Sequence, residues 1–383
     1  MTKLRYCPCV EPIINRLQFA AFFCLTALTC VACRGAQALP TIDQAAVMQV
    51  VRTYAGVRPP NPSPVATTHR PDEVSSPTLE SEEPYKARIR ALFEAANFQE
   101  LDKEVRTVRN KRERVEGGTW KLLLFYEAVA TPDAAGNADW EARRTKIKQW
   151  IASRPDSAAA QIALAGFYEA WAWAARGSGY SNSVSQSGWD LFGQRTQMAK
   201  KALMDAAVLK EKCPYWYEVM QNIAEDEGWD KTDARELLDQ AAAFEPTYYH
   251  YYRDYANFLL PKWYGEEGET QGFAEEIAKR LPEPDASITY FEIASILACQ
   301  CDKERDSLAG MSWPRVKQGY SELQRRYGVS DIKLNRFAYM AYVANDKEAA
   351  RQAFLLIPIF SRSVHVWRSN ETFESAKAWS DAP

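Results

Sequence analysis

Apolar residues recur every three or four positions through most of the chain, which is the spacing of one face of an α-helix. Two segments repeat the same pattern of alanines and large apolar residues, Ala199–Leu209 and Ala234–Phe244. Each is followed by a proline and then by an aromatic run, and these prolines, Pro214 and Pro246, are 32 residues apart. A repeat of this length predicts antiparallel helix pairs that stack into a solenoid.

The same spacing predicts helices over most of the remaining chain. A helical hairpin is expected between Pro84 and Gly117, and no stretch alternates with a period of two for long enough to indicate a sheet. Further helices are expected over Trp140–Ile151, Ser157–Ala175, 189–209, Pro214–Glu227, Thr232–Phe244, Thr247–Leu260, Thr270–Arg280, Ala286–Ala298, Pro314–Tyr327, Asp331–Val343 and Lys347–Leu356. The predicted fold class is all-α, with antiparallel helical hairpins stacked as a solenoid.

Residues 1–38 have the pattern of an export signal. Basic residues precede an apolar stretch over residues 17–33, and Ala36–Ala38 offers a cleavage site with small residues. This stretch is at the lower limit for a helix that spans a bilayer. Three outcomes stay open: cleavage after Ala38, lipidation at Cys30 or Cys33, and a retained membrane anchor. All three place the protein in the periplasm or cell envelope, with a possible membrane tether through the N-terminus.

The segment that follows is expected to be a flexible tether. This tether spans residues 39–83. Its part from Val57 to Pro84 is rich in proline, serine, threonine and glutamate and holds few large apolar groups, so it favours an extended chain. A short helix near Ile42–Tyr54 is possible. We expect the helical-repeat domain to span residues 84–360, followed by a C-terminal extension over 361–383.

Charge and cysteine content narrow the function classes. The formal net charge is −3, so a nucleic-acid partner is not expected. The basic run Arg106–Arg114 is interpreted as a solvated helix face. Three cysteines lie beyond the N-terminal leader, Cys213, Cys299 and Cys301, and this odd number does not indicate a disulfide framework. They are interpreted as buried small residues, although Cys213 could pair with one of the others in an oxidising compartment.

The sequence holds no recognisable catalytic constellation. Its only histidines are His69, His250 and His365, and no metalloprotease, nucleophile-elbow, phosphate-loop or dinucleotide motif is present. Carboxylates such as Glu225–Glu227 are interpreted as lying on helix surfaces and turns. We therefore expect no catalytic residue, no metal and no cofactor, while carboxylate chemistry without a motif stays open.

Aromatic residues provide the candidate binding positions. The Gly/Ser-rich insertion 176–189 carries Tyr180 and Trp189, and the loop 261–269 carries Trp263 and Tyr264 beside glycines and three glutamates. Both loops have simpler interpretations, a passive crossover and a solvated acidic turn. If they meet, they form a single pocket. Tyr248 and Tyr252 belong to a tyrosine-rich helix that suits either peptide contacts or core packing with the hydroxyls on backbone groups.

The hairpins resemble tetratricopeptide repeats, and a wider set of residues resembles a bacterial domain-of-unknown-function family, number 4034. The residues that carry this second resemblance are Asn97–Asp102, Trp120, Phe125–Tyr126, Ala170–Trp171, Arg176–Gly179, Gly188–Trp189 and Pro261–Gly265. They cover roughly residues 85–280. The resemblance implies a tetratricopeptide-like helical fold and adds no activity.

These observations together predict an exported helical-repeat protein that acts as a protein-binding or assembly scaffold in the bacterial cell envelope. Its partner would be a protein or peptide that the sequence does not identify. The alternative is an envelope hydrolase or a small-ligand-binding protein with its pocket between the loops 176–189 and 261–269.

Overall fold

A computed structural model describes residues 41–54, 79–134, 136–179, 181–300, 308–358 and 360–382. Seventeen α-helices and one short 3-10 helix make up the described part, which contains no β-strand. The predicted all-α class is therefore confirmed. The export-signal residues 1–38 and the candidate Tyr180 lie outside the described residues.

The helices follow one another with short connections. The first nine are α1 (Gln44–Tyr54), α2 (Glu82–Glu94), α3 (Phe98–Lys111), α4 (Lys121–Ala130), α5 (Asn137–Ser153), α6 (Ala158–Arg176), α7 (Gln186–Ala207), α8 (Pro214–Glu227) and α9 (Lys231–Phe244). The others are α10 (His250–Phe258), α11 (Glu269–Arg280), α12 (Asp285–Gln300), α13 (Trp313–Tyr327), α14 (Asp331–Val343), α15 (Lys347–Leu356), α16 (Val364–Trp367) and α17 (Asn370–Asp381).

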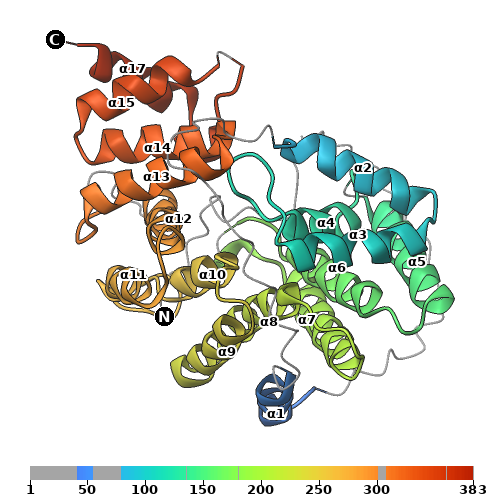
Figure 1. The fold of residues 1–383 in the computed structure, drawn as a ribbon. Coiled ribbons are helices and arrows are strands. Elements are labelled where there is room, and N and C mark those ends of the chain that lie inside the picture. The colour runs from blue at the N-terminus through green and yellow to red at the C-terminus, as the bar shows by residue number, and fades with distance from the viewer. Residues whose placement is uncertain are drawn as a thin grey trace, which may run out of the picture.

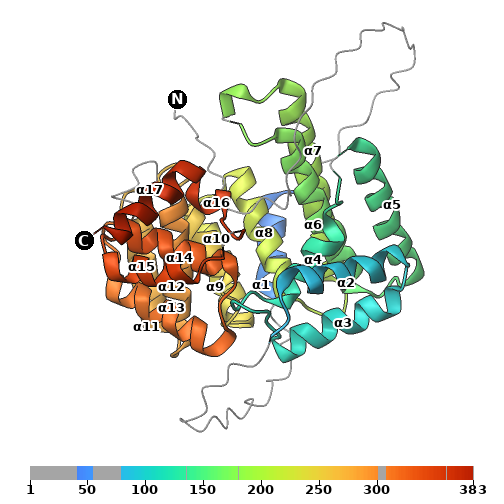
Figure 2. The ribbon, with the colours of Figure 1, turned by 90° about the horizontal axis from the view of Figure 1, so that it is seen from above.

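The even-numbered helices from α4 to α14 form an inner layer. Each of them packs against the next even-numbered helix, and the odd-numbered helices pack between them on the outside. Figure 1 shows this succession as an arc, with α7, α9 and α11 on its outer side. In Figure 2 the hairpin of α6 and α7 stands out from the rest of the arc. Two faces of each inner helix are therefore covered by neighbours, and a third faces the inside of the arc.

Most predicted helices agree with the structure to within one to three residues at each end, and α8, α14 and α15 have the predicted bounds. Helix α10 begins three residues later than predicted, at His250 rather than Thr247. The Thr247 carbonyl instead accepts hydrogen bonds from Arg114 Nη2 at 3.1 Å and Trp120 Nε1 at 3.3 Å. These side chains come from the loop between α3 and α4, so tertiary contacts replace the first turn of the predicted helix.

The predicted short helix near Ile42–Tyr54 is present as α1, but it is docked rather than part of a tether. Tyr54 is buried, and its ring stacks on Trp216 with centroids 4.1 Å apart. Its hydroxyl accepts a hydrogen bond from the Cys213 backbone N–H at 3.0 Å. Residues 42–54 therefore belong to the helical domain, because their apolar face is covered by α7, α8 and α9.

The described part of the C-terminal extension, residues 361–382, also packs on the helical domain. Helices α16 and α17 pack against α14 and α15. Trp367 is 1% exposed, and its Nε1 donates to Asn335 Oδ1 on α14 at 2.8 Å. This buried indole joins the extension to the preceding repeat.

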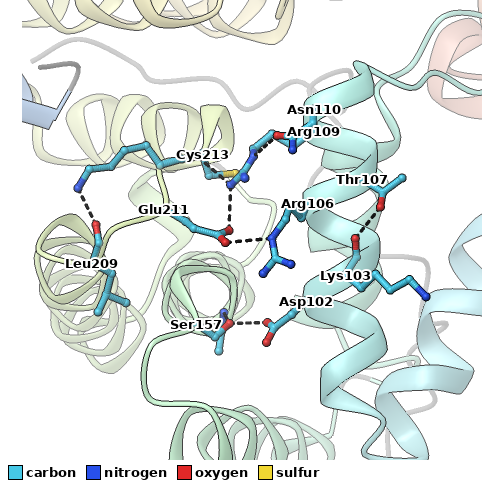
Figure 3. Close-up of polar contacts among 12 residues, drawn as sticks. Asp102, Lys103, Arg106, Thr107, Arg109, Asn110, Ser157, Leu209, Glu211 and Cys213 are labelled. Carbon is cyan, nitrogen blue, oxygen red and sulfur yellow. Dashed lines mark hydrogen bonds and ion pairs between the residues drawn. The ribbon is translucent and has the colours of Figure 1, made fainter. Parts of the chain in front are cut away.

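The basic run expected to form a solvated face is largely a docking face. On α3, Arg106 Nε contacts Glu211 at 3.0 Å and Arg109 Nη1 contacts the same carboxylate at 3.4 Å, as Figure 3 shows. Asp102 accepts a hydrogen bond from Ser157 at the start of α6 at 2.5 Å. These contacts hold the N-terminal hairpin against the α6–α8 region.

The loop between α3 and α4 brings the two ends of the arc together. Gly117 N donates to the Tyr327 carbonyl at the end of α13 at 3.0 Å. The buried Arg114 guanidinium lies 3.9 Å from the Trp120 ring centroid and 5.6 Å from that of Tyr327. The inner layer is thus closed by contacts between residues far apart in the sequence.

Close packing of α13 on α12 depends on Gly319. A Cβ atom placed there would lie 2.1 Å from the Ser287 carbonyl oxygen. We expect Gly319→Ala to reduce the free energy of unfolding by about 1–3 kcal/mol, measured by urea denaturation, because the backbone cannot move aside locally. Gly272→Ala on α11 is the matched control, since its Cβ would meet open space, and it should stabilise the helix slightly. A Gly319→Ala protein as stable as the Gly272→Ala protein would contradict this packing.

Candidate functional site

Five carboxylates gather on three consecutive inner helices. They are Glu169 on α6, Glu218, Glu225 and Asp226 on α8, and Asp254 on α10, and we call them the acid cluster. Glu218 and Glu225 are seven residues apart, so they lie two turns apart on the same face of α8. Glu169 and Glu218 are only 6% and 7% exposed. A concentration of buried acids of this kind is unusual, since carboxylates are almost never fully buried without a partner.

Two members of the acid cluster accept hydrogen bonds from neighbouring side chains, and two others have buried oxygens without a partner among the described residues. Glu218 accepts a hydrogen bond from the Tyr248 hydroxyl, and Glu225 accepts two from Asn257 Nδ2 at 2.9 Å. Both carboxylate oxygens of Asp226 are buried without a hydrogen-bond partner among the described residues. One buried oxygen of Asp254 is also unpartnered.

Burial and mutual repulsion keep these acids protonated at higher pH than usual. Burial, followed by the charges of Asp254 and Glu225, raises the pKa of Glu169 to about 8. Burial also raises the pKa of Glu225 to about 7 and that of Asp254 to about 7. Burial is also the main reason why the pKa values of Glu218 and Asp226 lie well above their ordinary range.

The surroundings of the acid cluster hold more hydrogen-bond acceptors than donors. Gln221 and Asn257 are 7% and 5% exposed, and each has a buried amide oxygen without a partner. Gln221 uses its Nε2 on the Tyr251 carbonyl at 3.2 Å, so its oxygen is the free end. Unpartnered buried acceptors cost free energy, and a ligand that brings N–H donors would remove that cost.

The chemical complement of this arrangement is a positively charged nitrogen group. In the described part of the chain, no set of three or more His, Cys, Asp or Glu side chains is arranged to hold a metal ion. An ammonium or guanidinium group supplies both the charge and the several N–H donors that the carboxylates and amide oxygens lack.

Residues of the two aromatic loops lie near the C-terminal end of α8, where Glu225 and Asp226 are placed. Arg176 at the end of α6 lies against the Trp189 ring, 5.2 Å from its centroid, and its charge lowers the pKa of Asp226. Tyr264 donates a hydrogen bond to the Glu225 carbonyl at 2.7 Å. Both loops therefore border the acid cluster.

The structure separates the predicted binding residues into two groups. Trp189 packs on Phe192 with centroids 5.8 Å apart, whereas Trp263 packs in a small apolar cluster with Leu260 and Ile296. The two indoles are half-buried and make no ring contact with each other, so they do not build one pocket directly.

Tyr248 and Tyr252 belong to the core. Both are 0% exposed, and the Tyr252 hydroxyl donates to the Pro246 carbonyl at 2.9 Å. The core-packing interpretation, with hydroxyls on backbone groups, therefore describes Tyr252, while Tyr248 reaches Glu218 instead. Neither ring is available at the surface in this structure.

The acid cluster was not identified from the sequence. Glu225 and Asp226 were interpreted as surface carboxylates, and this is wrong because the Asp226 oxygens are buried and Asn257 covers Glu225. The spacing of residues in α8 could have indicated this burial. Tyr215, Glu218 and Glu225 lie on one face of the helix, and the repeat pattern places that face toward the inside of the arc.

Residues 85–223 match the model of a family described as Domain of unknown function (DUF4034). This confirms the resemblance over those residues, and the match ends before the Pro261–Gly265 motif. It includes Glu169 and Glu218 but not Asp254. No curated protein and no solved structure matches the chain. Of the helices in the described residues, none combines the length and apolar character needed to cross a membrane.

Proposed function

We propose that this chain, which carries a DUF4034 match over residues 85–223, is a helical-repeat binding protein that takes a cationic group of a protein or peptide partner into the acid cluster. The carrying observation is that acids from three inner helices interact with one another, and that Asp226 and Asp254 have buried carboxylate oxygens without a hydrogen-bond partner among the described residues. A lysine or arginine side chain of the partner supplies the missing charge and donors.

The proposal extends to the cell envelope as the place of action. Its support is the sequence of residues 1–38, in which basic residues precede an apolar stretch and small residues follow it. The helical domain would then bind its partner outside the cytoplasm, as a scaffold without catalytic activity of its own.

Binding of a cation is expected to be coupled to proton release. The pKa of Glu169 is raised to about 8 and that of Asp254 to about 7, so a cation that favours the ionised forms displaces protons near neutral pH. The dissociation constant should therefore fall by about tenfold per pH unit for each proton released as pH rises from 6 to 8.

The test is fluorescence anisotropy of the full-length chain with a short lysine-containing peptide and with the same peptide carrying glutamine in place of lysine. The lysine peptide should bind more tightly as pH rises, and Asp226→Asn should weaken it by about tenfold or more. Glu266→Gln, in the exposed acidic turn, is the matched control and should leave binding unchanged. Equal affinity for both peptides, or no effect of Asp226→Asn, would exclude the acid cluster as the binding site.

A second candidate function, a hydrolase that uses carboxylates, is favoured by the raised pKa of Glu169. A carboxyl group that stays protonated to about pH 8 is suited to act as a general acid beside an ionised neighbour. Turnover of cell-wall glycan fragments that disappears in Glu169→Gln would favour this candidate over a scaffold.

A further inference from the structure

A second polar space lies where the ends of the inner layer meet. It is a small cavity between α4, α10 and α14, with about 20 Å³ open to the centre of a water-sized molecule. The lining includes His250 and Arg253 on α10, Lys333 and Arg336 on α14, Glu127 on α4 and Glu82 on α2. This lining is distinct from the acid cluster, although Arg253 and Asp254 are neighbours on α10.

Lys333 is already neutralised by a fully buried acid. Its Nζ donates to the two carboxylate oxygens of Glu292 on α12 at 2.6 Å and 2.8 Å. Arg253 Nε is farther from the same carboxylate, at 3.8 Å. Glu292 thus accepts two hydrogen bonds from Lys333 and makes only a long ion pair with Arg253.

His250 and Arg253 each have a buried side-chain nitrogen without a hydrogen-bond partner among the described residues. His250 is 4% exposed, and its Nε2 is buried and unpartnered. The Nε of Arg253 is also buried without a hydrogen bond. The two residues are three positions apart on α10, so their side chains lie on the same face of the helix. Burial, together with Arg253, Lys333, Arg114 and Arg336, holds the pKa of His250 well below its ordinary value, so the imidazole is neutral in a positive surrounding.

We propose that this cavity binds a carboxylate group, which accepts hydrogen bonds from Arg253 Nε and from His250 Nε2. A carboxylate provides two oxygens in one plane for two donors. Ile332, Leu123 and Leu124 give the cavity an apolar side for the carbon that carries the group. Glu82 and Glu127 also line the cavity, so a monoanion is favoured over a dianion such as phosphate.

The carboxylate site is separate from the acid cluster, because it is built from other residues and takes an anion rather than a cation. Its first test is nuclear magnetic resonance of the full-length chain with ¹⁵N-labelled histidine, since the sequence has only three histidines. Sodium acetate at constant ionic strength should shift the His250 imidazole signals to saturation, while His69 and His365 stay in place. Sodium chloride should not produce this shift. The proposal would be overturned if the chemical shifts of His250 did not change with acetate, or if chloride changed them equally.

Substitution of Arg253 makes the test residue-specific. Arg253→Gln should weaken acetate binding by about tenfold or more, because it removes both the charge and the Nε donor. If Arg253→Gln loses the native spectrum, Arg253→Lys retains the charge, removes the Nε donor and should still weaken binding. An acetate affinity equal to that of the wild type in a folded Arg253 variant would refute the assignment.

The source of the carboxylate is distinguished by a second set of probes. One probe is trialanine with a free C-terminal carboxylate. If it binds at least about tenfold more tightly than propionate, the site is assigned to the C-terminal end of a peptide. Saturation by propionate but not by trialanine assigns it to a small free carboxylate. Both results support a carboxylate site. Trialanine amide that binds as well as the free acid, or phosphate that binds more tightly than acetate, would contradict it.

Discussion

Replacing Glu292 by glutamine is expected to lower the free energy of unfolding by about 3–5 kcal/mol. Glu292 is 0% exposed, and it is the acid that three cationic side chains of α10 and α14 face. Burial alone would raise its pKa, but Lys333, Arg253 and Arg336 together hold the pKa below its ordinary value. Burial lowers the pKa of Lys333 to about 8 even beside this acid, because two guanidinium groups are also near. Without Glu292, the buried Lys333 ammonium loses the carboxylate that accepts its two hydrogen bonds, and Arg253 loses an ion pair.

Two further variants separate lost charge from lost packing. Glu292→Gln/Lys333→Met removes the pair together and should recover most of the stability, since an apolar replacement of a buried pair is often neutral. Glu100→Gln on the exposed face of α3 should change stability by less than about 0.5 kcal/mol. Urea denaturation of the three proteins provides the measurement. If Glu292→Gln unfolded within about 1 kcal/mol of the wild type, the charge balance argued for this region would be incorrect.

Local sequence signals were sufficient for the helices. Pro214 begins α8 and Gly228 ends it, and Asp346 caps α15 by accepting from Ala349 N at 3.1 Å. Each of these signals acts within one or two turns of its own helix. Their bounds could therefore be predicted without knowledge of the tertiary structure. The same holds for the all-α class, because a short connection after each helix favours an antiparallel neighbour.

The candidate site could not be predicted in the same way, because it depends on how the inner helices are placed. Glu169, Glu218 and Asp254 come from separate inner helices. The sequence of one repeat therefore does not predict that its acid will lie close to the acids of the neighbouring repeats. The docking of Tyr54 on Trp216 has the same origin, since the residues between α1 and α2 carry no helical pattern. Long-range placement also explains why Tyr248 is part of the core: its partner Glu218 lies on the preceding inner helix.

The acid cluster is expected to make the fold less stable as pH rises from 6.5 to 8. An acid whose pKa is raised on folding keeps its proton in the folded state after the unfolded chain has lost it. The stability that this proton provides is complete below the unfolded pKa and is lost as pH rises through the folded value. The folded pKa is about 8 for Glu169 and about 7 for Glu225 and Asp254, so the loss continues up to about pH 8. Each retained proton changes the free energy of unfolding by about 1.4 kcal/mol per pH unit, so the fall should be on the order of 2–4 kcal/mol.

Other titrating groups act mainly outside this window. The pKa of His250 is lowered, so its effect lies below about pH 6.5, while the lowered pKa of Lys333 acts from about pH 8 upward. Urea denaturation at intervals between pH 6.5 and 8 measures the fall, with Glu169→Gln/Asp254→Asn as the test variant. The amide side chains of this variant do not ionise, so its free energy of unfolding should change less with pH. At pH 8 the variant should be more stable than the wild type. Glu266→Gln/Glu267→Gln, in the exposed turn, is the matched control and should follow the wild type. A wild-type stability that is constant or rises over this range would show that the five carboxylates are ionised and compensated in the folded state.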